Sequence, residues 1–157
     1  MKRTLLTLLT LLGLAGVHGQ ALACPDAPQP PLPRSELRVE TRDGGNHVFD
    51  VELAREPDEK ACGLMMRQRL GRDEGMLFEY RPPGPAFMWM RNTILPLDMV
   101  FIDAEGRIVH LEENAEPLTT TSRGTRADVA GVLEVLAGTV ERLGIRRGDR
   151  VIHPIFD

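Results

Sequence analysis

The stretch that decides the fold is residues 37–53, LRVETRDGGNHVFDVEL. Leu37 and Val39 alternate with polar residues, and the same alternation resumes at Phe49 after the turn-forming residues 42–46. Apolar residues at every second position give a strand one buried face, and two such runs around a glycine-rich turn predict a β-hairpin. The sequence therefore predicts a domain that begins with paired antiparallel strands.

Later segments extend this prediction to the whole domain. An apolar run at 97–102, a turn at 103–106 and a returning strand at 108–111 predict a second hairpin. Further strands are expected at 76–80, 86–90, 132–136 and 150–153, short helices at 57–69 and 139–143, and a polar connection at 112–126. No alternation of helices and strands indicates a parallel sheet. We expect a mainly-β fold, a single compact antiparallel barrel or sandwich with one or two short helices.

The N-terminal residues 1–23 have the pattern of a secretory signal peptide. Lys2 and Arg3 precede a short apolar run, and Ala21 and Ala23 supply the small residues at which a signal peptidase cleaves. The apolar run is too short to span a bilayer comfortably, which takes roughly 20 residues. The sequence therefore predicts an exported protein, periplasmic or extracellular, with no transmembrane segment in the mature chain.

Residues 24–34, CPDAPQPPLPR, contain five prolines and are predicted to form an extended linker. A single mostly-β domain is then expected over residues 35–157. Cleavage after residue 23 would remove two basic residues and no acidic one, which lowers the net charge from −4 to −6. This balance argues against nucleic acid as a partner, because the phosphates of nucleic acids require basic patches, and no nucleic acid partner is predicted.

The two cysteines, Cys24 and Cys62, admit more than one interpretation. In an oxidising compartment they can pair as a disulfide. Cys24 would also be the first residue of the mature chain, and a lipoprotein anchored there is the alternative. The residues before it, Ala-Leu-Ala, are not in the order typical of a lipoprotein signal, which favours simple cleavage. Cys62 alone could also be a small buried hydrophobic residue.

Three blocks of the sequence resemble a known family. They are GLMMRQRLGRDEGMLFEY (63–80), FMWMRNTILPLDMVFID (87–103) and VLEVLAGTVERLGIRRGD (132–149). Together they resemble Domain of Unknown Function family 192, and the resemblance covers roughly residues 37–152. It implies a mainly-β fold and a secreted protein, and it implies no particular reaction. Cys62 departs from the family, whose members often carry another residue there, so a disulfide with Cys24 would be peculiar to this chain.

The candidate ligand-binding residues are Trp89, Arg91, Asn92, Thr93 and Asp98. A Trp beside a turn rich in hydrogen-bond donors and acceptors is typical of pockets that orient a small polar ligand. Asp98 interrupts an apolar strand, where an acid is costly unless it faces solvent, pairs or serves a ligand. The alternative is a purely structural role for these residues. Trp89 would then be part of the core, Asn92 and Thr93 would hydrogen-bond to backbone groups of the turn, and Asp98 would cap a helix or pair with an arginine.

The sequence also contains residues that could form a metal site or a hydrolytic site. Met88 and Met90, with Met65 or Met66 opposite and His47, His110 or His153 as further ligands, could offer soft ligands to Cu(I). Methionine more often fills irregular cores, so no metal and no cofactor are predicted. For hydrolysis, no nucleophile motif is present, and Asp98 with Glu79 is the remaining acidic pair.

The sequence leaves three hypotheses for the function, with no enzyme activity favoured. The first is a non-enzymatic exported module that binds a small polar ligand or an envelope partner. The others are a carbohydrate-directed hydrolase of the cell envelope and a purely structural scaffold. Burial of Trp89 and Asp98 discriminates among them, because an exposed face favours binding and a cleft with convergent acids favours catalysis.

Overall fold

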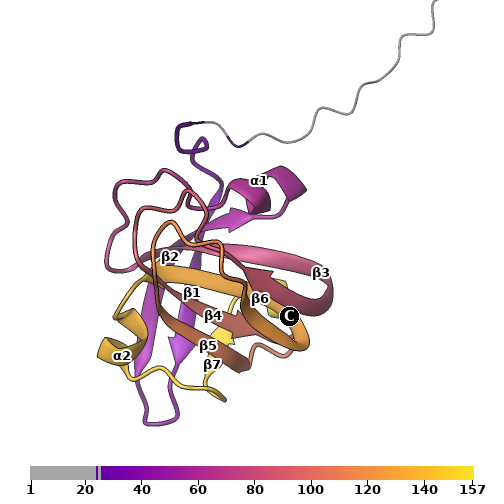
Figure 1. Cartoon of the computed structure of the whole chain (residues 1–157). Coiled ribbons are helices and arrows are strands. Elements are labelled where there is room, and N and C mark those ends of the chain that lie inside the picture. The colour runs from indigo at the N-terminus through magenta and orange to yellow at the C-terminus, as the bar shows by residue number, and fades with distance from the viewer. Residues whose placement is uncertain (1–23, 25) are drawn as a thin grey trace, which may run out of the picture.

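The protein folds into one curled sheet with two short helices at its periphery (Figure 1). The computed structural model describes Cys24 and residues 26–157, so the predicted signal peptide, residues 1–23, lies outside the described residues. The elements are β1 (Arg34–Glu40), β2 (Asn46–Ala54), α1 (Pro57–Cys62), β3 (Glu74–Met88), β4 (Leu97–Ile102), β5 (Ile108–Ala115), β6 (Arg123–Leu136), α2 (Thr139–Leu143), β7 (Arg150–Ile152) and a 3-10 turn, η1 (Pro154–Phe156). The predicted mainly-β class with short helices is confirmed.

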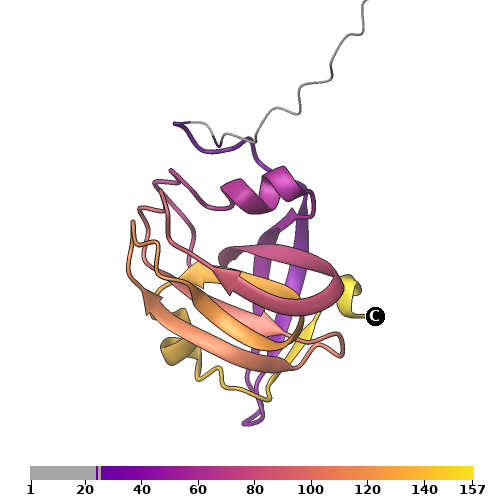
Figure 2. The ribbon, with the colours of Figure 1, turned by 45° about the vertical axis from the view of Figure 1, so that its right-hand side comes forward.

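The described strands form a seven-stranded sheet in the order β5-β4-β6-β3-β2-β1-β7. The sheet curls enough to bring its two edges together at one end, as the rotated view in Figure 2 illustrates. The Val151 amide donates to the Gly106 carbonyl at 2.7 Å, and the Gly148 amide donates to the Ile108 carbonyl at 2.7 Å. Gly106 permits this approach, because a side chain there would meet the Val151 carbonyl oxygen at 2.5 Å.

Both predicted hairpins are present, but one strand pair runs parallel. β1 pairs antiparallel with β2, and β4 pairs antiparallel with β5. β2 and β3, in contrast, are parallel neighbours, with α1 and residues 63–73 between them. Parallel neighbours require a crossover of this kind, since the chain must return to the same end of the sheet. The expectation of a wholly antiparallel sheet is therefore wrong at this pair.

Several elements differ in length from their predictions. β5 runs to Ala115 and β6 begins at Arg123, so much of the polar connection predicted at 112–126 is strand. The helix predicted over 57–69 ends at Cys62, because Gly63 takes a positive φ of 46°, and a side chain at this position would meet the Phe78 ring at 3.1 Å. The strands predicted at 76–80 and 86–90 belong to one strand, β3, which ends at Met88 and pairs with β6 on both sides of residues 80–83. The proline-rich residues 81–85 are accommodated by shifts in register instead of a turn between separate strands.

Each face of the sheet carries its own apolar cluster. Leu77, Val100 and Leu133 belong to a cluster that also includes β1, β2 and α2. Met76 and Met99 belong to the other cluster, which packs against the chain that follows α1. Neighbouring residues of one strand point to opposite faces, so each face can serve a different purpose. No helix of the described residues is long and apolar enough to cross a membrane.

Candidate functional site

A pocket of about 270 Å³ lies between α1 and the end of β3. Phe87 and Trp89 are at its rim, and both are unusually exposed for their size, at 52% and 50%. Leu64, Met65 and Met88 add further apolar surface to its lining. A concave, mostly apolar site with a few polar groups is the usual form of a small-molecule binding site.

The principal polar group of this pocket is Glu134 of β6. Its residue surface is only 4% exposed, yet its side chain lines the pocket. No group in Cys24 or residues 26–157 donates a hydrogen bond to its carboxyl or forms an ion pair with it, and the carboxyl lies at the pocket. Burial raises the pKa of Glu134 to about 8. Removal from water disfavours the charged form of an acid, so the carboxyl is mostly protonated at neutral pH.

Other buried carboxylates of the described chain are fully engaged. Glu52 accepts hydrogen bonds from the Leu32 amide at 2.9 Å and from Nη2 of Arg67 at 2.8 Å. Asp149 accepts from the Arg146 amide at 2.7 Å and from a second backbone amide. Buried polar groups normally have such partners, so the isolation of Glu134 requires an explanation.

Two polar side chains near Glu134 have other partners. Tyr80 donates its hydroxyl hydrogen to the sulfur of Met88 at 3.3 Å, and burial, with the charge of Glu134, raises the pKa of Tyr80 to about 12. Lys60 of α1 donates from Nζ to the Glu79 carbonyl at 2.9 Å and lies 5.4 Å from the centre of the Tyr80 ring. Neither group therefore neutralises the Glu134 carboxyl.

The predicted turn residues lie at one side of this pocket. The guanidinium of Arg91 is 6.0 Å from the centre of the Trp89 ring. Thr93 lines the pocket but is 4% exposed, and its hydroxyl donates to the Arg91 carbonyl at 3.3 Å. Asn92 has a positive φ of 53°, which Asn tolerates better than most residues, and its carbonyl accepts from the Met66 amide. The structure thus brings Trp89 and Thr93 into the pocket and uses Asn92 to shape the turn.

Asp98 lies on the opposite face of the sheet from Glu134. It is fully buried, with Oδ1 accepting from the Asn114 amide at 2.8 Å and Oδ2 accepting from the Val140 amide at 2.9 Å. Asp98 is paired in register with Val135, so the adjacent Glu134 must point to the other face. The structure does not bring Asp98 together with Trp89.

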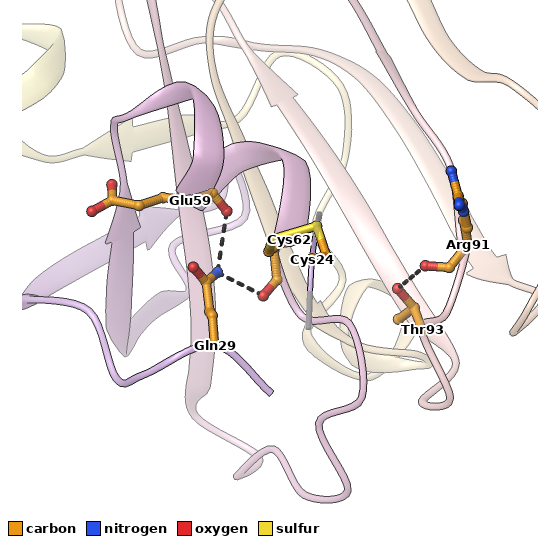
Figure 3. The surroundings of a disulfide bond; sticks show 7 residues. Cys24, Gln29, Glu59, Cys62, Arg91 and Thr93 are labelled. Carbon is orange, nitrogen blue, oxygen red and sulfur yellow. Dashed lines mark hydrogen bonds between the residues drawn. A yellow bond between two sulfur atoms is a disulfide. The ribbon is translucent and has the colours of Figure 1, made fainter. Parts of the chain in front are cut away.

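The N-terminal segment is attached to the wall of the pocket (Figure 3). Cys24 and Cys62 form a disulfide with a Cα–Cα distance of 5.3 Å, and Cys62 itself lines the pocket. Nε2 of Gln29 donates to the Glu59 carbonyl at 3.1 Å and to the Gly63 carbonyl at 2.8 Å. These contacts connect the predicted linker, residues 24–34, to α1.

The methionines do not gather as the copper hypothesis requires. Met65 and Met88 line the pocket, whereas Met90 is fully buried in the core. Within Cys24 and residues 26–157, no group of three or more His, Cys, Asp or Glu side chains is placed to hold a metal ion. Cu(I) prefers several soft ligands, and two thioethers in an otherwise apolar pocket are a weak set.

Comparison with known families identifies the chain. A family model described as "DUF192: Uncharacterized ACR, COG1430" matches residues 38–153. The chain belongs to this family. The resemblance expected from the three sequence blocks is therefore confirmed, and the family's description assigns no activity.

Two solved structures resemble this DUF192 protein. One is a protein of Sinorhizobium meliloti 1021 described as "a putative transcription regulator", with 42% identity and a TM-score of 0.79 over 81% of this chain and 98% of that one. Another is a protein of unknown function from Novosphingobium aromaticivorans DSM 12444, with 40% identity and a TM-score of 0.76 over 83% of this chain and 94% of that one. A search of curated proteins found no match.

The acidic pair considered for hydrolysis is also separated in this DUF192 protein. Both oxygens of Asp98 are engaged by backbone amides, and Glu79 forms ion pairs with Arg55 and Arg81. Within the described part of the chain, Glu134 is the single acid that lines the pocket. Glycoside hydrolysis usually requires two carboxyl groups that flank one bond, which this arrangement does not supply.

Glu134 is the site residue that the sequence analysis missed. It interrupts the apolar run Val132-Leu133-Glu134-Val135, as Asp98 interrupts its own strand. The argument that selected Asp98, that an acid in a buried strand needs a reason, applies equally to Glu134. Sequence alone could have nominated both residues.

Proposed function

We propose that this protein is an exported binding protein for a small organic ligand that occupies the pocket between α1 and β3. The observation that carries the proposal is Glu134, a buried carboxyl without a protein partner at a pocket whose rim exposes Trp89 and Phe87. Aromatic rings supply contact area for the body of a ligand, and one polar group fixes its orientation.

The composition of the pocket supports binding rather than catalysis. Catalytic sites usually combine a perturbed acid with a second group that activates a nucleophile or stabilises developing charge. Around Glu134 the pocket presents Tyr80, whose hydroxyl is bonded to Met88, and Thr93, whose hydroxyl is bonded to Arg91. A single polar group in an apolar cavity is sufficient for recognition.

Two observations support export. The residues before Cys24 have the pattern of a signal peptide, and the Cys24–Cys62 disulfide suits an oxidising compartment. A thioether-linked lipid on Cys24 would exclude this disulfide, so mass analysis of the N-terminus in the envelope fraction separates the two forms. A chain that retains residues 1–23 in the cytosol would contradict export.

Nothing in the charge of the chain favours the description given to the Sinorhizobium protein. Binding to DNA requires a basic face, whereas this chain has 23 acidic and 19 basic residues. A regulator could also act by sensing a small molecule, and that role would use the same pocket.

The proposal is tested by a thermal-shift screen of the purified protein against small aromatic and alkyl compounds of each charge type. Any compound that binds only the native state raises the melting temperature, by an amount that depends on its concentration relative to Kd. We expect stabilising compounds, and we expect Trp89→Ala to reduce their effect. Val48→Ala is the matched control, because Val48 is also about half exposed but is not at the pocket.

Two results would count against the proposal. The first is a screen without any stabilising compound at millimolar concentration. The second is a set of stabilising compounds that bind Trp89→Ala and Val48→Ala as strongly as they bind the unaltered protein, which would place their site elsewhere.

A further inference from the structure

We propose that the ligand is a small organic cation, an ammonium group on an aromatic or alkyl body, with its ammonium bound to the Glu134 carboxylate. This inference rests on the proposed function, since it names the class of ligand for the same pocket. It is drawn from the placement of one acid among aromatic and aliphatic side chains.

The Glu134 carboxyl has no hydrogen-bond partner among the described residues. The carboxyl of a Glu or Asp residue that is as little exposed as Glu134, at 4%, normally accepts several hydrogen bonds, as those of Glu52, Asp98 and Asp149 do in this chain. None of the described residues provides one for Glu134, although its side chain lines a pocket open to solvent. A ligand that enters this pocket is therefore the group best placed to satisfy the acid.

The cationic side chains of the described residues do not pair with Glu134. Lys60 is the cationic residue among those that line the pocket, and its ammonium is held by the Glu79 carbonyl above the Tyr80 ring. β3 and β4 place Met76 and Met99 in register with Glu134, so the neighbouring strands bring no charge to it. The titratable groups around Glu134 are thus Lys60 and Tyr80, and neither bonds to it.

The walls of the pocket include several aromatic rings. Tyr80, Phe87 and Trp89 all line it, and aromatic faces attract ammonium groups through their quadrupoles. The chain already places Lys60 against Tyr80 and Arg91 against Trp89. A buried carboxylate with aromatic walls favours a cation, because the cation offsets the cost of removing the carboxylate from water.

The affinity of the pocket for a cation should depend on pH. Burial holds the pKa of Glu134 near 8, so the unliganded carboxyl must lose a proton before it can pair with an ammonium ion. Affinity for a cation should rise as pH increases toward 8, by about tenfold per pH unit below that value, and then level off. Tyr80 stays neutral over this range, because burial raises its pKa to about 12.

The fluorescence of the protein provides a direct assay. Trp89 is the only Trp and Tyr80 the only Tyr of the chain, so both intrinsic fluorophores lie at this pocket. Three phenyl probes of matched size are titrated: 2-phenylethylammonium, 2-phenylethanol and phenylacetate. We expect the ammonium to bind at least about tenfold more tightly than the alcohol, and the anion to bind most weakly.

Two variants locate the effect. Glu134→Gln keeps the shape of the side chain but carries no charge, so it should bring the affinities of the ammonium and the alcohol to within a few-fold of each other. Glu113→Gln, which removes an exposed acid of β5, is the matched control and should change neither affinity. Should Glu134→Gln fold poorly, the rise of ammonium affinity between pH 6 and 7 in the unaltered protein gives the same information.

The outcomes separate the two proposals. Equal affinities of ammonium and alcohol, both weakened by Phe87→Ala, would overturn the cation inference and leave the binding function standing. Tightest binding of phenylacetate, or a preference for the ammonium that survives in Glu134→Gln, would also overturn it. Failure of all three probes would overturn the cation inference, and the wider thermal-shift screen would then decide the binding function on its own.

Discussion

Two buried acids on neighbouring strands are placed under opposite conditions. Asp98 of β4 accepts hydrogen bonds from two backbone amides, at 2.8 and 2.9 Å, and ties α2 and Asn114 to the sheet. Glu134 of β6 lies almost beside it in the register but points to the other face, into the pocket below α1. The first acid is satisfied by the fold, and the second is left without a protein partner.

The difference shows how one sheet can separate stability from function. An acid whose oxygens are both occupied contributes to the fold and offers a ligand nothing. An acid that is buried and has no protein partner lowers the stability of the fold, and functional sites commonly contain such destabilising residues. The predictions below test whether the two acids differ in this way.

The largest expected effect belongs to Asp98. Asp98→Ala should lower the free energy of unfolding by roughly 3–5 kcal/mol, because two buried amides lose charged acceptors. Urea unfolding measures the change, with Glu113→Ala as a surface control. A loss below about 1 kcal/mol would show that Asp98 does not brace the fold, and the contrast with Glu134 would disappear.

The next effect is a dependence of stability on pH that belongs to Glu134. Its pKa is near 8 in the folded protein and near 4.5 in the unfolded chain, so the folded state holds the extra proton between these values. The contribution of Glu134 to stability should therefore be greatest at low pH and should fall as pH rises, by about 3 kcal/mol between pH 5 and 7. In Glu134→Gln, the free energy of unfolding measured in urea should not show this decrease between pH 5 and 7. An identical dependence of stability on pH in the variant and the unaltered protein would contradict the account.

A smaller effect of opposite sign is expected from an apolar replacement. Glu134→Leu should raise the free energy of unfolding at pH 7 by about 1–2 kcal/mol, because it replaces a largely buried carboxyl that has no protein partner with an apolar side chain of similar volume. The same variant should lose binding of any ligand that depends on the carboxyl. Thermal unfolding provides the measurement, and a clear loss of stability would mean that Glu134 has a partner within the fold.

Much of the fold could be predicted from local patterns. The alternation around Phe49 and the apolar run at 97–102 each indicate a hairpin, and both hairpins are present. The parallel pairing of β2 with β3 could not be predicted in this way, because it depends on where residues 63–73 return the chain. The length of β3 could not be predicted either, since prolines at 82, 83 and 85 predict a turn. The register shifts that accommodate these prolines depend on the pairing of β3 with β6.

The candidate site could be predicted only in part. Trp89, selected from the sequence, lies at the pocket, and its role as a ligand contact stays a prediction. An acid in an apolar strand was a sound reason for interest in Asp98. What distinguishes Asp98 from Glu134 is the position of the Asn114 and Val140 amides, which are 16 and 42 residues away from Asp98 in the chain. Such partners are set by the three-dimensional fold, so the sequence could nominate both acids without deciding between them.

The central claim is that Glu134 is a buried acid kept without a protein partner for use by a ligand, and its own titration tests this most directly. Carboxyl carbon NMR of the purified protein, with Glu134→Gln used to assign the resonance, should show Glu134 titrating near pH 8. Addition of 2-phenylethylammonium should move this titration to lower pH, since a cation stabilises the carboxylate. A titration of Glu134 near the ordinary value of about 4.3, unchanged by the cation, would contradict the account.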